Sequence, residues 1–175
     1  MRRFVWIPLF WLIYSWSPLL AKDWLSVPMS SSGYAEFSKW EVGQHKTKKD
    51  VETTVWVPKG ENINNWTKKF SVQTFRKPWV GPSLQSLVDQ LKEGISRSCP
   101  ALTWNVTESS ENEISYEYSF EHCQGKDMHE IGKWIQGKDS QFWLQYTHTV
   151  KELDPDERKV WMQIICGSKV TQGGR

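Results

Sequence analysis

The side chains of this sequence best suited to chemistry are four histidines and three cysteines. An imidazole can act as a base or a metal ligand, and a thiolate beside an imidazole can act as a nucleophile. The histidines form no His-x-x-x-His or comparable metal pair, and they are His45, His122, His129 and His148. His122 precedes Cys123, but we expect that cysteine to lie in a disulfide. The sequence therefore predicts neither a metal site nor a Cys–His nucleophile.

Paired carboxylates are the other arrangement that could support catalysis, as in glycoside hydrolysis. Glu117, Glu121 and Asp139 are available, but their spacing does not select two of them. Glutamates that alternate along a strand are typical of a solvated sheet face. The sequence also lacks a phosphate-binding glycine loop and a Gly-x-Ser-x-Gly motif. We therefore expect a protein without enzymatic activity and without a cofactor, with a hydrolase as the enzymatic alternative.

The three cysteines indicate one disulfide and one free thiol if the protein is exported. Their spacing fits no zinc pattern and no Cys-x-x-Cys redox motif. We favour a Cys99–Cys123 bond, because Cys99 ends a predicted helix and Cys123 ends a predicted strand. Cys99–Cys166 is the competing pair, because Cys166 ends the last predicted helix.

The first 21 residues have the layout of a secretory signal peptide. A short basic start precedes a mostly apolar stretch that reaches Leu20, and the small residue Ala21 offers a cleavage point. A membrane anchor is the alternative, but the apolar run is shorter than the roughly 20 residues that a span requires. We expect an exported protein with no stable membrane span after cleavage.

Charge argues against a nucleic-acid partner. The chain has 22 Lys and Arg against 20 Asp and Glu, and loss of Arg2 and Arg3 with the signal peptide makes the remainder formally neutral. A neutral domain exerts no general attraction on phosphate backbones or anionic lipid. The basic cluster at 46–49 is typical of a solvated loop or strand edge. The oligomeric state cannot be deduced from this composition.

Alternating apolar and polar residues predict the elements that position these side chains. Six strands are expected, at 49–58, 65–75, 102–107, 113–123, 129–136 and 141–150, with a possible seventh near 34–42. Ser83 and Asp154 are typical N-cap residues, and they introduce predicted helices at 84–97 and 155–166. The predicted class is α+β: an antiparallel sheet of about five to seven strands with two helices packed on one face.

The predicted domain organisation is simple. Residues 1–21 form the signal peptide, 22–33 a flexible leader, 34–166 a single α+β domain and 167–175 a flexible tail. The leader carries Pro28 and a Ser-Ser-Ser-Gly cluster, and the tail is polar and rich in glycine.

An excess of tryptophan is the unusual feature of the composition, with 12 in the full chain. If Phe142, Leu144 and Tyr146 face the helices, their neighbours along the strand face away from them. The predicted binding surface is this outer sheet face with the 136–140 turn at its rim, and it comprises Trp56, Gln73, Trp134, Gln136, Lys138, Asp139, Trp143 and Gln145. The alternative is that N-terminal residues or a curled sheet cover these rings.

One pattern of motifs spans most of the chain from Gln44 to Cys166. It comprises Trp56-Val57-Pro58 with Gly60-Glu61, Asn65-Trp66-Thr67, Ser71-Val72-Gln73, Cys99-Pro100, Cys123 and Ile135-Gln136-Gly137-Lys138-Asp139-Ser140. The pattern resembles a family of small exported bacterial proteins of unknown function, and the resemblance supports the Cys99–Cys123 pairing. Family members carry a further cysteine beyond the position of Cys166, which this chain lacks. The predicted topology also resembles PsbP and Mog1-like domains, and the family resembles accessory proteins of type IV secretion or conjugation loci.

The functional hypothesis combines these observations. We expect a secreted or periplasmic accessory protein that acts by protein–protein contact in an envelope or secretion-related process. Flat indole rings beside amide and hydroxyl groups suit such contacts. The alternative is a module that binds glycans or small ligands with the same Trp-rich sheet face.

Overall fold

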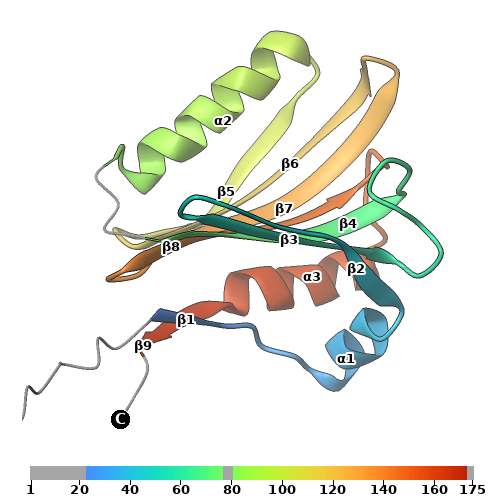
Figure 1. Ribbon diagram of the computed structural model, residues 1–175. Coiled ribbons are helices and arrows are strands. Elements are labelled where there is room, and N and C mark those ends of the chain that lie inside the picture. Colours follow the sequence, from blue (N-terminus) through green and yellow to red (C-terminus); the bar gives the residue numbers. More distant parts are fainter. Residues whose placement is uncertain (1–22, 77–80, 173–175) are drawn as a thin grey trace, which may run out of the picture.

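A computed structural model describes residues 23–76 and 81–172 of the chain (Figure 1). The predicted signal peptide lies outside the described residues. The elements are, in order, β1 (Asp23–Ser26), α1 (Ser31–Phe37), β2 (Trp40–Lys48), β3 (Val51–Pro58), β4 (Lys68–Arg76), α2 (Leu84–Ser98), β5 (Thr103–Ser109), β6 (Glu113–Cys123), β7 (Lys126–Gln136), β8 (Ser140–His148), α3 (Pro155–Gly167) and β9 (Lys169–Gln172).

The main sheet is antiparallel and has seven strands in the order β2-β3-β4-β8-β7-β6-β5, while β1 and β9 form a separate pair. This confirms the predicted α+β class, and the seven strands of the main sheet equal the upper limit of the predicted number. Both outer strands of the main sheet carry a register shift, between Val42 and Gln44 in β2 and between Val106 and Glu108 in β5. Irregular edge strands are poor templates for unwanted pairing with other chains.

The helices lie on opposite sides of the sheet (Figure 1), which corrects the prediction that two helices share one face. Helix α2 packs on β6 and β7 from one side, and α3 packs on β7 and β8 from the other, with α1 beside it. The physical reason is that the central strands are apolar or aromatic on both faces. Along β7, Ile131 and Ile135 belong to the core under α3, whereas Trp134 belongs to the core under α2.

The core on the α3 side centres on Trp161. Its ring stacks on Tyr146 at 4.0 Å between centroids and lies 5.4 Å from Phe70, so one helix residue joins two neighbouring strands. Asp154 caps α3, accepting hydrogen bonds from the amides of Asp156 and Glu157 at 2.9 and 3.2 Å. The N-cap and the proline at the first helical position match the prediction.

The core on the α2 side is an aromatic ladder on β6. Tyr116, Tyr118 and Phe120 follow one another along this face, and Trp104 of β5 stacks against the first two at 5.0 and 5.4 Å. The ring of Tyr116 lies across Gly132 of β7, where any Cβ atom would collide with it. A glycine opposite Tyr116 therefore lets the phenol reach over its neighbouring strand.

Part of the predicted flexible leader and tail forms regular structure, because residues 23–26 form β1 and residues 169–172 form β9. Strand β1 pairs with β9 in antiparallel register from Asp23–Gln172 to Ser26–Lys169. Leu25, Val27 and Met29 pack against the core on the α3 side. The N-terminal segment is thus bound by apolar burial, which its proline and serine content did not indicate.

The Cys99–Cys123 disulfide is formed, and Cys166 is free. This confirms the favoured pairing and excludes Cys99–Cys166. The bond joins the end of α2 to the end of β6 across 24 residues of sequence, which stabilises the fold by roughly 3 kcal/mol in the chain-entropy description.

An ion-paired carboxylate fastens α3 to the sheet. Glu117 accepts two hydrogen bonds from the Arg158 guanidinium at 2.7 and 2.6 Å and lies 2.8 Å from His129 Nε2. Although burial alone would raise it, these hydrogen bonds from His129 and Arg158 lower the pKa of Glu117 to about 2, from an ordinary 4.5. The depressed pKa means that the ionised form contributes stability.

This arrangement predicts a defined acid sensitivity. The contribution of the Glu117 charge is fully present above pH 4.5 and is lost as the pH falls towards 2, because the unfolded chain binds a proton at Glu117 more readily than the folded protein does. We expect Glu117→Gln to lower the free energy of unfolding by about 2 kcal/mol at pH 7, since Arg158 is partly solvent-screened. The difference from wild type should shrink between pH 4.5 and pH 2 in urea titrations. Glu93→Gln, on the exposed side of α2, is the control, and an equal pH response in both variants would contradict the assignment.

Candidate binding surface on the sheet

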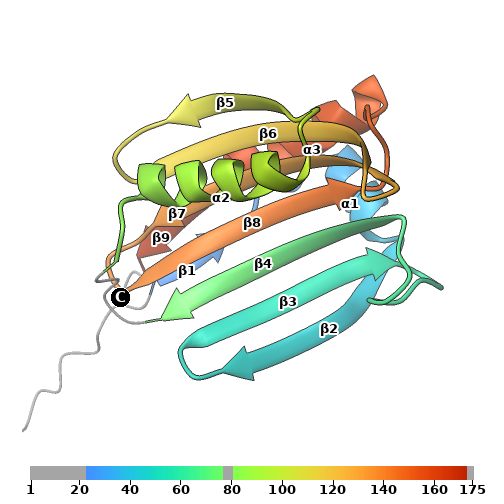
Figure 2. The same ribbon diagram turned by 90° about the horizontal axis from the view of Figure 1, so that it is seen from above.

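One side of the sheet is only half covered. Figure 2 shows α2 lying over β6 and β7, whereas no helix of the described chain lies over β4, β3 and β2 on that side. We call this region the open sheet surface, and its side chains are Trp143 and Gln145 from β8, Ser71 and Gln73 from β4, Thr53 from β3, and Gln44 and Lys46 from β2. The pairing Lys46–Thr53–Gln73–Trp143 sets these residues in a row across four strands.

The structure brings together three of the predicted site residues on this surface and moves two others into the core. Gln73, Trp143 and Gln145 lie on it, each half-buried. Trp134 faces the same side but lies at its boundary with α2, where it is 6% exposed. The Trp143 ring stacks on the Trp134 ring, with 4.6 Å between their centroids. The Phe75 ring also stacks on Trp134, at 5.6 Å between centroids. Trp134 is therefore a core residue.

Trp56 lies on the opposite side of the sheet from Gln73, which corrects their predicted grouping. It pairs with Phe70 across β3 and β4, and the two rings stack at 5.3 Å within the core on the α3 side. Alternation within each strand was predicted correctly. The offset between the two strands depends on the connection from Pro58 to Lys68, and a one-residue difference there exchanges the faces.

A buried carboxylate lies beneath this surface, and it was not predicted. Glu130 of β7 is 3% exposed and accepts four hydrogen bonds from side chains. Its Oε1 accepts from Tyr116 and Gln145, both at 3.0 Å, and its Oε2 accepts from Tyr118 and Thr147, both at 3.1 Å. Burial raises the pKa of Glu130, while these donors and the charge of Lys69 oppose that rise. A buried carboxylate is tolerated only when it is so completely satisfied.

The Glu130 network fixes the side chains of the open sheet surface. Gln145, which donates to Glu130, also accepts a hydrogen bond from the Ser71 hydroxyl at 3.3 Å. The indole of Trp143 donates to the Tyr116 hydroxyl at 2.8 Å. Gln145 is therefore held directly by Glu130, and Trp143 is held through Tyr116, so the positions of both side chains are set before any ligand arrives. With four donors already bound, Glu130 itself is suited to structure rather than to proton transfer.

The predicted rim turn lies at the far end of the β7–β8 hairpin and contacts the N-terminal strand. The Asp23 Oδ2 atom accepts hydrogen bonds from the amides of Asp139 and Ser140 at 2.6 and 2.9 Å. Gly137 leaves room for this carboxylate, because a Cβ atom there would collide with it. Gln136 donates to the carbonyl of Gly137, and Lys138 is exposed. The turn thus anchors β1, a role that its sequence did not reveal.

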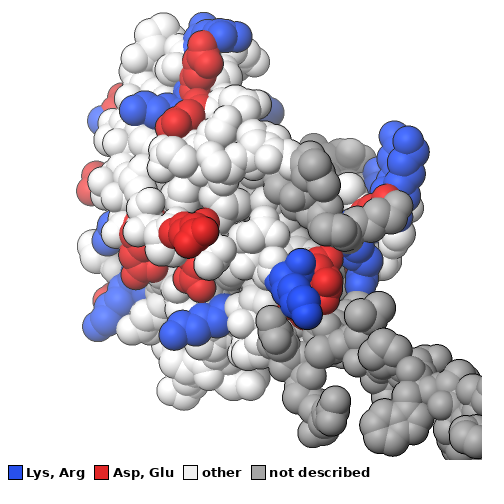
Figure 3. All heavy atoms as spheres, turned by 90° about the vertical axis from the view of Figure 1, so that its left-hand side faces the viewer, with Lys and Arg blue, Asp and Glu red and all other residues white. Residues whose placement is uncertain are grey.

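Two observations bear on metal and nucleic-acid binding by the described residues. No group of three or more His, Cys, Asp and Glu within 23–76 and 81–172 is arranged to hold a metal ion. Figure 3 shows Lys and Arg interspersed with Asp and Glu, and the described part of this face has no continuous basic stripe of the kind that nucleic-acid-binding domains present. In the same residues, no helix is long and apolar enough to cross a bilayer.

Comparison with known proteins leaves the family assignment as a prediction. No protein-family model matches the chain, and no curated protein matches it significantly. The resemblance to exported bacterial proteins therefore rests on the motifs alone, as does the similarity to PsbP and Mog1-like domains.

The Glu130 network predicts graded effects of substitution. We expect Glu130→Ala to lower the free energy of unfolding by roughly 3 kcal/mol, because four buried donors lose their acceptor. Glu130→Gln should cost less, because the amide oxygen keeps two of the four hydrogen bonds and the Tyr118 and Thr147 hydroxyls can accept from its nitrogen. Urea unfolding at neutral pH measures both, with Glu152→Ala in an exposed loop as the control. Equal losses for the Ala and Gln variants would contradict the proposed role of the acceptor.

The contact between Asp23 and the turn predicts a local effect. Asp23→Ala removes the acceptor of two amides, so hydrogen exchange at Asp139 and Ser140 should accelerate roughly tenfold, in line with the loss of one or two hydrogen bonds to a charged group. Exchange in the centre of β7, at Ile131, is the internal control. Unchanged exchange at the turn would show that Asp23 does not hold it.

Proposed function

We propose that this chain is an exported, non-enzymatic accessory protein that contacts a protein partner through the open sheet surface. Following the motif resemblance, the process would be one of the cell envelope, with secretion-related machinery as the leading setting. The observation that carries the proposal is the pairing of exposure with rigidity: no helix covers this surface on the described chain, yet buried hydrogen bonds fix Trp143 and Gln145. Side chains fixed before binding lose little entropy when a partner docks.

Export is supported by two independent features. The first residues have the layout of a signal peptide, and the described domain contains a disulfide. Disulfides persist in oxidising compartments and are rare in the cytosol of mesophiles. The periplasm or the extracellular medium is therefore the proposed location.

The shape and chemistry of the open sheet surface favour a protein over a glycan. A glycan platform needs accessible ring faces, but Trp134 is covered by Phe75 and Trp143, and Trp143 itself rests on Trp134. The other groups of this surface are amides, hydroxyls and Lys46, spread over four strands, a width of roughly 15 Å. A broad polar surface with an aromatic residue at one side, here Trp143 on β8, is typical of transient protein interfaces.

Site-specific photo-cross-linking tests the proposal. We expect a photoreactive phenylalanine analogue at Gln73 to capture one envelope protein in the bacterium that produces this chain, and Trp143→Ala to reduce the capture at least tenfold by removing an aromatic anchor next to Gln73. The same analogue at Lys159, which is exposed on α3 on the other side of the sheet, is the matched control.

Two results would count against the proposal. Equal capture from positions 73 and 159 would show nonspecific labelling, and capture that Trp143→Ala leaves unchanged would place the interface elsewhere. Circular dichroism of the Trp143→Ala protein must match wild type, so that loss of capture cannot be assigned to unfolding.

A further inference from the structure

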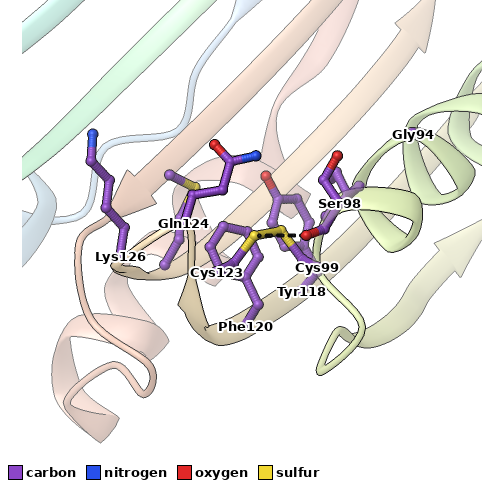
Figure 4. Close-up of a pocket in the computed structure, with 10 residues that line it drawn as sticks. Gly94, Ser98, Cys99, Tyr118, Phe120, Cys123, Gln124 and Lys126 are labelled. Atoms are coloured by element: carbon purple, nitrogen blue, oxygen red, sulfur yellow. Dashed lines mark hydrogen bonds between the residues drawn. A yellow bond between two sulfur atoms is a disulfide. The ribbon is translucent and has the colours of Figure 1, made fainter.

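A hollow of about 380 Å³ lies between the C-terminal half of α2 and the β6–β7 hairpin (Figure 4). We call it the disulfide pocket; it is bounded by Ile95, Phe120, Met128 and the Cys99–Cys123 bond. Tyr118 contributes a further aromatic wall. Its volume is at the lower end of the range of about 300 to 1,000 Å³ that is typical of small-molecule sites.

Helix α2 contributes a glycine to the wall of the pocket. Gly94 lines the pocket in the last third of the helix, and a Cβ atom added there would have no neighbour within 4 Å. Glycine at an exposed helix position costs about 1 kcal/mol relative to alanine. The backbone of α2 thus borders open space at Gly94, so a long side chain at this position can extend into the pocket.

The hairpin on the other side of the pocket is also held in an unfavourable conformation. His122 and Gln124 have φ angles of 48° and 52°, the left-handed region that non-glycine residues rarely adopt. They flank Cys123, at the register shift between Phe120 and Cys123. The disulfide and the hydrogen bond from the His122 amide to Asp127 at 2.8 Å hold this bend. The bend places Gln124 and Lys126 at the rim.

The lining of the pocket indicates the kind of ligand that fits it. Aromatic rings, the Met128 thioether and the disulfide sulfurs form its walls, and sulfur packs favourably against aromatic rings. Lys126 is the one charged side chain among the described residues that line it, beside the polar Ser98 and Gln124. An aromatic body would be buried against the walls, and an acidic group would meet the lysine at the rim.

We propose that the disulfide pocket binds a small aromatic anion of one or two rings, with its acidic group directed to Lys126. The pocket is formed by α2, β6 and β7 and shares no residue with the open sheet surface. This inference is therefore independent of the proposed protein contact, and either can fail without the other.

Two fluorescent probes that differ in charge test the inference on the purified mature protein. One is 8-anilinonaphthalene-1-sulfonate, an aromatic anion, and the other is N-phenyl-1-naphthylamine, its neutral counterpart. We expect both to bind wild type, and Gly94→Leu to raise both dissociation constants at least tenfold by filling the pocket. Lys126→Glu should raise the dissociation constant of the anion about tenfold and leave that of the neutral probe within twofold, because only the anion interacts with the charge at the rim.

Ser96→Leu is the matched control, since it adds the same side chain to an exposed position of α2 that does not line the pocket. Near-ultraviolet circular dichroism of each variant must match wild type, because unfolded protein also binds these probes. Failure of wild type to bind either probe, or equal binding by the Gly94→Leu and Ser96→Leu proteins, would overturn the inference. An unchanged preference for the anion in Lys126→Glu would overturn the role of the lysine.

Discussion

The burial of one negative charge in the middle of the sheet is the constraint that most of this structure obeys. An unpaired carboxylate in such a position would cost several kcal/mol, so Glu130 must be surrounded by donors. Those donors come from β6 and β8, and they fix the orientation of Tyr116, Tyr118 and Gln145. Each of these side chains also contacts a second group. The need of Glu130 for hydrogen-bond donors therefore helps to fix the aromatic ladder, strand β4 and the open sheet surface.

The aromatic ladder in turn decides where α2 lies. Tyrosine rings on a sheet face must exclude water along their length while their hydroxyls keep polar partners. Helix α2 supplies the apolar cover with Leu84 and Val88, and Glu130 supplies the acceptor. The other sheet face is covered separately by α3 through Trp161. A sheet with two such faces needs a helix on each, which leaves the outer strands β2 to β4 without helical cover on the α2 side.

The sequence permitted good prediction wherever a local rule decides the structure. Alternation located β3 to β8, Ser83 and Asp154 marked the beginnings of α2 and α3, and the ends of predicted elements indicated the Cys99–Cys123 pair. The possible strand near 34–42 was misplaced, because that segment contains the end of α1 and only the start of β2. Prediction failed where contacts between distant segments decide. Alternation does not show which face of a strand a helix covers, so α2 was assigned to the wrong side of the sheet. Alternation also does not fix the register of β3 against β4, so Trp56 was assigned to the wrong face. Glu130 was missed because its four donors come from two other strands, β6 and β8. Strand β1 was missed because its partner β9 is far away in the sequence.

The pairing of β1 with β9 has a consequence for the order of folding. Asp23 and Gln172 are paired, so this ladder can form only after the segment up to residue 172 is available. Contacts of such long sequence separation carry a large loop-closure cost and form late. In synthesis from the N-terminus, β1 therefore stays unpaired until β9 has been made. The small two-stranded sheet is then expected to close after the main sheet has formed, so the apolar residues that follow β1 reach the core late.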